Sequence, residues 1–397
     1  MTRSSALLLA YLAFVAIGLP DGALGIAWPS LRDGFALPQS GLALILMAQT
    51  AGYLLAGTAS ARLLGRLAIG DLLARSTAVV ALAAIAFALA PTTAVLPLAG
   101  FVLGLGSATI DAGLNAHAAA HFSARHLNWL HAAYGIGAAL GPVILTWTLA
   151  SSGDWRLGYA VLAALLFALG ILFHARRTAF AATAPVRGGA TVEGLAAVPH
   201  DGRRLAALQV LAFAIYTGIE ASLGSWSFAV LREARGLPLE VAGAGAAAFW
   251  ASLCLGRFLV GFVADRAGSA LLIRGGAALT LLGTTLFLLL PGPLAIGGLA
   301  LAGLALAPIF PMLMLRTAER FAPELAARLF GLQVSAAMVG ALVLPSLAGI
   351  LADLVALAAI PWLIAAASAV LLLLVLPITR PPPAFSPTAG PPPRGPA

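Results

Sequence analysis

The chain contains no lysine, a single cysteine and few charged residues of any kind. All 22 basic residues are arginine, so the sequence has neither the lysine of a nucleotide-binding P-loop nor a lysine for Schiff-base chemistry. Cys254 alone can form neither an intrachain disulfide nor a cysteine-rich metal site. Only 9% of the residues are charged, against roughly 25% in soluble domains, and 61% are hydrophobic. No soluble core hides so much apolar sequence, which indicates an integral membrane protein.

Apolar stretches long enough to cross a hydrocarbon core of about 30 Å occur twelve times. The predicted spans are 6–30, 40–60, 71–90, 94–120, 128–150 and 157–174, followed by 205–231, 239–264, 270–290, 294–317, 328–351 and 359–379. An Ala-, Gly- and Pro-rich stretch with five arginines separates the two sets, and a proline-rich segment follows the last span. We therefore expect an all-α membrane protein with an N-terminal half, a cytoplasmic linker, a C-terminal half and a disordered cytoplasmic tail, over residues 1–174, 175–204, 205–379 and 380–397.

The arginines predict the orientation of the spans. Seventeen of them fall in the segments that share a side with the N-terminus, four fall in the alternate loops, and Arg257 lies inside the span 239–264. Because cytoplasmic loops carry the excess of positive charge, both termini are expected in the cytoplasm, in a cell inner membrane. The net charge of +8 does not indicate nucleic-acid binding, since the arginines are scattered singly and form no basic stripe.

The two sets of spans repeat each other. At an offset of 203 residues, 125–142 matches 328–345 at Arg, Ala, Gly and Pro positions, and an offset of 199 places Asp21 on Glu220. Such repeats predict two six-helix halves related by pseudo-two-fold symmetry. In that architecture a solute site lies near the membrane midplane, where the halves meet.

The loop over 261–268 reads G-F-V-A-D-R-A-G, which resembles the G-x-x-x-D-R-x-G loop signature of the major facilitator superfamily. Its counterpart over 57–66 keeps the glycines and arginines but has Ala61 in place of the aspartate. The resemblance implies that loop charges bridge neighbouring helices in one gate state. The implied gate residues are Arg62, Asp265 and Arg266, with the alternative that these charges only set the topology.

Three further segments resemble the fucose permease-like branch of proton-coupled sugar symporters. Residues 21–29 place Asp21 before apolar residues and a proline, 104–115 carry Asp111 and Asn115 in a G-x-x-x-x-x-x-D-x-x-x-N pattern, and 127–131 read L-N-W-L-H. Span 104–115 has an aspartate where the branch usually has a glutamate. Glu220 stands where the fucose permease has an uncharged polar residue. The resemblance implies symport of a monosaccharide or a related polyol, driven by a proton gradient without cofactor or metal.

Three carboxylates, Asp21, Asp111 and Glu220, lie near the middle of otherwise apolar spans. An acid at a helix centre costs roughly 2.5 to 3.5 kcal/mol against lipid, so all three are expected to face one central cavity. Loss of water disfavours a carboxylate's charge, which lets such a group take up and release a proton near neutral pH. We therefore predict that they couple transport to protons. The alternative for each is a neutral or paired carboxyl that holds two helices together.

Other polar and aromatic side chains within the spans are candidates for solute binding. Ser107, Asp111 and Asn115 recur at steps of four and form one stripe on a helix, which lines a cavity or else joins helices by hydrogen bonds. His131 is either a proton relay or part of the cytoplasmic gate. Tryptophan rings can stack on the apolar faces of sugars or lie at the membrane interface. The remaining substrate-binding candidates are Gln49, Tyr53, Asn128, Trp226, Trp250 and Gln333.

These observations together predict a secondary transporter and not an enzyme. The first interpretation is proton-coupled symport of a small polar solute, most simply a monosaccharide or polyol, by alternating access. The second is a proton-driven antiporter that exports drugs or amphiphilic metabolites. The expected partners are the solute and the lipid bilayer, with neither nucleic acid nor nucleotide, and the expected state is a monomer.

Overall fold

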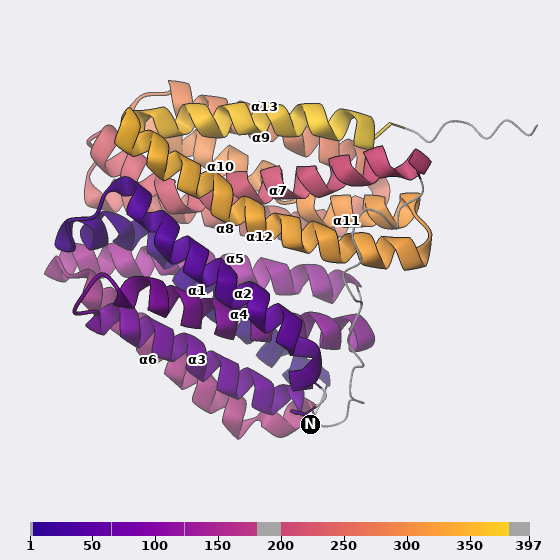
Figure 1. Cartoon of the computed structure of the whole chain (residues 1–397), viewed down its shortest axis with the longest axis horizontal. Helices are drawn as coiled ribbons and strands as arrows, with labels where there is room; N and C mark the ends of the chain where they lie inside the picture. The colour runs from indigo at the N-terminus through magenta and orange to yellow at the C-terminus, as the bar shows by residue number, and fades with distance from the viewer. Residues whose placement is uncertain (1–2, 65, 123, 181–199, 381–397) are drawn as a thin grey trace, which may run out of the picture.

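The computed structural model describes residues 3–64, 66–122, 124–180 and 200–380, and all regular structure among them is helical (Figure 1). The first set of long helices is α1 (Arg3–Gly34), α2 (Leu42–Leu64), α3 (Ile69–Leu89), α4 (Val95–His121), α5 (Ala124–Ser152) and α6 (Trp155–Ala175). The second set is α7 (His200–Ala229), α8 (Leu239–Ala267), α9 (Ser269–Leu289), α10 (Ala295–Leu306), α11 (Ile309–Arg320), α12 (Pro323–Leu354) and α13 (Ile360–Ile378). Short turns of helix are η1 (Gln39–Gly41), η2 (Arg177–Phe180), η4 (Val230–Ala234), η5 (Gly292–Leu294) and η6 (Leu357–Ala359).

Twelve helical segments of the described chain are long and apolar enough to cross a membrane. This confirms the predicted all-α class with twelve spans. The predicted span 294–317 is one crossing made of two helices, because α10 ends at Leu306 and α11 begins at Ile309. Pro308 stands between them, and a proline removes a backbone donor and clashes with the preceding turn of a continuing helix.

The helices pack in two groups that follow the chain (Figure 1). Helices α1–α6, the N half, pack mainly on one another through the pairs α2/α4, α1/α5 and α3/α6. Helices α7–α13, the C half, do the same through α7/α12, α9/α10 and α8/α10. The halves meet along α5 and α8, with further contacts between α1 and α7 and between α2 and α12.

The internal repeat is visible as one helix crossing that occurs in each half. A Cβ atom built on Gly137 of α5 would lie 2.1 Å from the carbonyl oxygen of Val15 on α1. A Cβ atom on Gly340 of α12 would lie 1.9 Å from the carbonyl oxygen of Ala214 on α7. Only glycine allows two helices to approach so closely, and the four residues match at the two offsets found in the sequence. The same backbone contact therefore fixes the first helix of each half against its fifth span.

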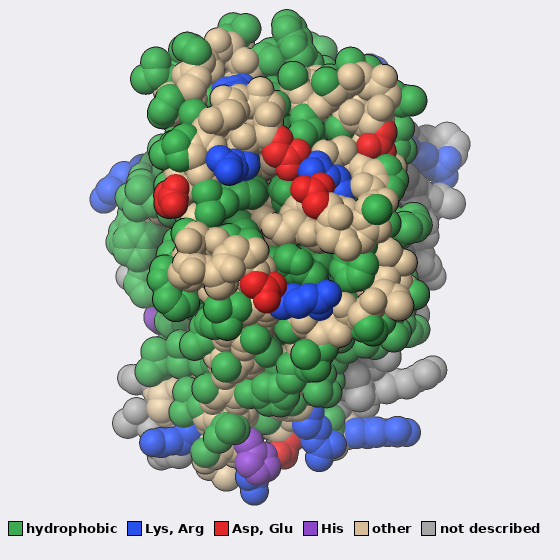
Figure 2. Space-filling model, turned by 90° about the vertical axis from the view of Figure 1, so that its left-hand side faces the viewer, with side chains coloured by type: hydrophobic (Ala, Val, Ile, Leu, Met, Phe, Trp, Pro, Cys, Tyr) green, Lys and Arg blue, Asp and Glu red, His purple; other side chains and the backbone are tan. Residues whose placement is uncertain are grey.

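The bundle has two different ends. We call the end where α1 begins, α6 ends and α13 ends the linker end, and the end where α1 and α7 finish the far end. Helices α2 and α12 lie close together at the far end and diverge toward the linker end (Figure 1). Figure 2 views the far end, where acidic and basic side chains gather across the middle of the face. The halves are joined there by an ion pair between Arg32 and Glu233 with an N–O distance of 2.9 Å.

Candidate functional site

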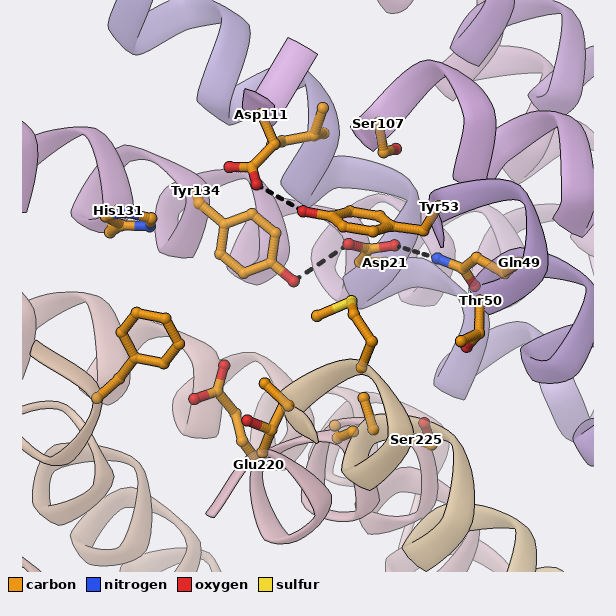
Figure 3. A pocket seen from close by; sticks show the side chains of 18 of the residues that line it. Asp21, Gln49, Thr50, Tyr53, Ser107, Asp111, His131, Tyr134, Glu220 and Ser225 are labelled. Carbon is orange, nitrogen blue, oxygen red and sulfur yellow. Dashed lines mark hydrogen bonds between the residues drawn. The ribbon is translucent and has the colours of Figure 1, made fainter. Parts of the chain in front are cut away.

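A cavity of about 290 Å³ lies between the two halves. Helices α1, α2, α4 and α5 line it from the N half, and α7, α8, α11 and α12 line it from the C half. Asp21, Asp111 and Glu220 all border this cavity, so the prediction that the three carboxylates share one space is confirmed. Figure 3 shows Asp21 and Asp111 on one side of the cavity and Glu220 on the other.

Asp21 is held on α1 by two neutral hydrogen-bond donors. The Gln49 side-chain amide donates to one carboxylate oxygen at 2.9 Å, and the Tyr134 hydroxyl donates to the other at 3.1 Å (Figure 3). Gln49 comes from α2 and Tyr134 from α5, so three helices of the N half meet at this carboxylate. Neither of these partners is a cation, which leaves the charge of an ionised Asp21 without a counter-charge in direct contact.

Asp111 on α4 has the same kind of surroundings. The Tyr53 hydroxyl donates to one oxygen at 2.5 Å, and the Asn115 amide donates to the other at 2.8 Å. Gln49 and Tyr53 lie four residues apart on α2 and therefore share one helix face. A single helix thus supplies one donor to each of the two carboxylates.

Glu220 on α7 is instead part of an ion pair. Arg257 on α8 donates to both of its oxygens at 3.1 and 3.2 Å, and the Tyr216 hydroxyl donates to one of them. Both charged side chains are only 11% exposed. Arg257 also reaches across to the N half, where its guanidinium donates to the backbone oxygen of His131 at 3.4 Å. The pair matches the alternative of a paired carboxyl, while a role of Glu220 in proton coupling stays a prediction.

Most of the remaining predicted solute-binding residues lie at the cavity. Ser107, His131 and Trp250 line it together with Gln49 and Tyr53. Asn115 reaches it indirectly, through its hydrogen bond to Asp111.

Besides Asn115, two described candidates for solute binding, Trp226 and Gln333, do not line the cavity. Trp226 is completely buried, and its indole N–H donates to the backbone oxygen of Pro345 at 3.0 Å. Gln333 is also completely buried, where its amide donates to the Thr317 hydroxyl at 2.7 Å beside Gln209. Trp226 joins α7 to α12, and Gln333 joins α12 to α11 and α7. The sequence marked Trp226 as a possible stacking ring and Gln333 as a polar residue within a span, but it could not show which neighbour each would contact.

Several predicted positions fall outside what the structure describes. The side chains of Arg62, Asp265 and Asn128 are among these, so the gate and solute roles proposed for them stay predictions. Arg266 is described and is exposed near the end of α8. Residues 181–199 of the predicted linker and 381–397 of the predicted tail also lie outside the described chain.

Three titratable residues that line the cavity were not predicted from the sequence, namely Tyr134, Tyr216 and Arg257. Arg257 was recognised only as an arginine inside a span, although a buried cation predicts an acidic partner nearby. Tyr216 lies four residues before Glu220, a spacing that places two side chains on one helix face. Tyr134 follows His131 by three residues, which also places it on the cavity side of α5.

The two halves contribute different electrostatics to the cavity. The N half supplies two carboxylates with neutral donors, whereas the C half supplies an acid and a base that compensate each other. At the offset of 199 residues, Asp111 corresponds to Phe310, which lines the cavity with an apolar ring. Within the described residues, no three His, Cys, Asp or Glu side chains are grouped as a metal ion would require. The carboxylates without a cation as hydrogen-bond partner therefore lie in the N half.

Comparison with known proteins places the chain in a family. The family model of the Major Facilitator Superfamily matches residues 10–333 and 210–396. A bacterial homologue of the human lysosomal transporter Spinster, solved in an inward-facing and occupied conformation, shares 15% identity with a TM-score of 0.74, and 95% of this chain and 96% of that chain are covered. The nucleoside transporter NupG, solved as a point mutant, shares 14% identity with a TM-score of 0.70, and 94% of this chain and 99% of that chain are covered.

At these identities the likeness to solved structures concerns the fold. No curated protein matches the chain. The family match covers most of the chain, and it agrees with the twelve spans and with the cavity between two halves. The chain therefore belongs to the major facilitator superfamily, and it is a multi-pass membrane transporter of a small-molecule solute.

Proposed function

We propose that the protein is a proton-coupled symporter of a small polar solute, a monosaccharide or related polyol, which the proton gradient drives without a cofactor. The observation that carries this proposal is the pair Asp21 and Asp111, two carboxylates that face the cavity between the halves and whose hydrogen-bond donors among the described residues are all neutral. No neighbouring cation neutralises the negative charge of such a carboxylate. A proton can therefore neutralise it, binding in one step of the transport cycle and leaving in another.

The two carboxylates have different roles in this proposal. Asp21 is the obligatory proton carrier, because its charge is costly when the cavity closes and water leaves. Asp111, with Asn115 one turn away, binds solute and senses the proton. Carboxylate oxygens accept hydrogen bonds from solute hydroxyls, and a protonated carboxyl can in turn donate. The cavity can then close around its contents only when both the proton and the solute are bound.

The rest of the cavity suits a solute with hydroxyl groups and apolar faces. Thr217 and Ser225 of the C half line it opposite the carboxylates, and the Trp250 and Phe310 rings lie on the same side. Pockets for such ligands combine aromatic walls with a few placed polar groups. The likeness of residues 21–29 and 104–115 to the fucose permease-like branch supports the same solute class.

We further propose that the linker end is cytoplasmic and that the structure is inward-facing. The positive-inside rule places the arginine-rich segments, which include Arg177 and Arg380, in the cytoplasm. The halves contact each other at the far end and diverge toward the linker end (Figure 1). In a cell inner membrane, the cavity would then release its solute to the cytoplasm.

One observation favours a second function, proton-driven export of an amphiphilic cation. The cavity also presents Phe14, Phe310 and Met338, so that an acidic wall faces aromatic and apolar side chains. An organic cation would be attracted to both. In that case proton and substrate would compete for the carboxylates, and substrate affinity would fall as the pH is lowered.

Uptake of labelled solutes into proteoliposomes tests the proposal. A panel of monosaccharides and polyols should include at least one that accumulates above its external concentration only when a proton gradient, acidic outside, is imposed. Binding in detergent should not weaken from pH 8 to pH 5. Binding that weakens steadily over that range, together with proton-driven export of lipophilic cations, would replace the symporter by the exporter.

A further inference from the structure

An aspartate of the C half holds backbone of the N half at the far end. Asp353 lies near the end of α12, and its two carboxylate oxygens accept the N–H groups of Gln39 at 2.7 Å and Ser40 at 2.9 Å. These residues form η1, the turn that leads directly into α2. We call this contact the far-end clamp. The donors from the N half are backbone N–H groups. Among substitutions of residues 39 and 40, only one to proline would therefore remove a donor.

The second polar contact between the halves at this end is the ion pair of Arg32 and Glu233. Arg32 ends α1, and Glu233 lies in η4, a turn of π-helix that follows α7. The Arg32 guanidinium donates to both Glu233 oxygens, at 2.9 and 3.2 Å. These side chains are 16% and 25% exposed, and Asp353 is exposed as well, so solvent weakens both contacts. A carboxylate that accepts two N–H groups is charge-assisted at both bonds and directional. Of the two contacts, the one made by Asp353 holds the backbone that leads into α2.

Helix α2 connects this clamp to the carboxylates in the cavity. Its leading turn is held by Asp353, and the Gln39 side chain is fixed in turn by the Trp28 indole N–H at 3.1 Å. Further along the same helix, Gln49 donates to Asp21 and Tyr53 donates to Asp111. One helix thus touches both proposed proton sites and one of the contacts that join the halves at the far end.

We propose that α2 couples the charge of Asp21 and Asp111 to the far-end clamp, with Gln49 and Tyr53 as the positioning residues and Asp353 as the releasing residue. The inference rests on the proposed proton coupling. Hydrogen bonds to an ionised carboxylate are roughly twice as strong as those to a neutral one, so protonation loosens the hold on α2. The start of α2 then shifts against Asp353, and the far end is free to open.

Other charged or titratable groups face these carboxylates and also influence their charge. Around the cavity they are Tyr134, His131, Tyr216, Glu220 and Arg257. At the far end they are Arg32, Asp33 and Glu233.

The clamp is tested by the accessibility of a cysteine from the far end. In a Cys254→Ala background, Ser225→Cys places a reporter on α7 that lines the cavity close to the far end. An impermeant thiol reagent is added outside right-side-out vesicles. Asp353→Asn should raise the labelling rate about fivefold, which corresponds to about 1 kcal/mol. Glu240→Gln is the matched control, because Glu240 is an exposed acid in the first turn of α8, at the same end, and belongs to neither of the two contacts between the halves.

The coupling through α2 is tested by a double-mutant cycle on the same reporter. Tyr53→Phe removes a donor that α2 carries, and Tyr134→Phe removes a donor that α5 carries. Tyr53→Phe should raise the labelling rate about threefold, and it should add nothing once Asp353→Asn is present. Tyr134→Phe should combine with Asp353→Asn multiplicatively, as independent sites do.

Two outcomes would overturn the proposal. Unchanged labelling in Asp353→Asn would show that the clamp does not hold the far end closed. Multiplicative effects of Tyr53→Phe and Asp353→Asn would show that α2 does not transmit the change. Because labelling needs neither solute nor proton gradient, either failure is distinct from a failure of proton-coupled uptake in proteoliposomes.

Discussion

At the scale of single residues, matching positions of the two halves have different partners. Asp21 and Glu220 occupy matching positions, yet Asp21 contacts neutral donors and Glu220 contacts Arg257. Asp111 corresponds to the apolar Phe310. The N half therefore holds the carboxylates that we propose to change charge, whereas the C half has a compensated ion pair and aromatic rings.

Substitutions of the two N-half carboxylates are expected to have different effects on transport. Asp21→Asn should abolish accumulation driven by a proton gradient while solute exchange across the membrane persists. Asp111→Asn should weaken solute binding about tenfold or more, which corresponds to about 1.4 kcal/mol, and should change its pH dependence. Proteoliposome uptake and binding in detergent measure the two effects. Gradient-driven accumulation that survives in Asp21→Asn would show that another group carries the proton.

The ion pair of Glu220 and Arg257 in the C half is expected to affect stability. Arg257→Met leaves a buried Glu220 without its cation, which typically costs about 3 to 5 kcal/mol. The double change Arg257→Met with Glu220→Gln removes both charges and should recover most of the thermal stability in detergent. If the single and double variants melted at the same temperature, the pair would not be a buried compensated contact.

At the scale of helices, the sequence predicted what depends on local composition. Long apolar runs gave the twelve spans, and the cost of a carboxylate in lipid predicted that Asp21, Asp111 and Glu220 face one cavity. The choice of partners was not predictable, because Arg257, Gln333 and Trp226 bond residues that lie 16 to 126 positions away. The sequence shows Pro308, but it did not predict that the span is divided there into two helices, because membrane helices often tolerate proline.

The close helix crossing found in each half predicts that a methyl group added at its glycine lowers the stability of the protein. Gly340→Ala would place a Cβ atom 1.9 Å from the Ala214 carbonyl oxygen, so α12 and α7 must separate. We expect a loss of about 1 to 3 kcal/mol, typical of overpacking, seen as a lower melting temperature in detergent. Gly297→Ala on α10 is the control, because nothing lies within 4 Å of its added Cβ atom. Equal melting temperatures of the two variants would contradict the close crossing.

At the scale of the whole molecule, we expect the linker end to lie in the cytoplasm. In the Cys254→Ala background, Ser152→Cys at the far end and Thr178→Cys in η2 are both exposed reporters at opposite ends of the bundle. An impermeant maleimide added outside intact cells should label position 152 and spare position 178. The reverse result would invert the orientation and turn the proposed inward-facing state into an outward-facing one.

The most direct test of proton-coupled symport is the sign of the proton movement that a solute causes. Proteoliposomes with a pH-sensitive dye inside and no imposed gradient receive a transported monosaccharide outside. Symport predicts that the lumen becomes acidic as solute enters, and that Asp21→Asn abolishes the signal. A lumen that becomes alkaline, or solute entry with no change of internal pH, would contradict the account.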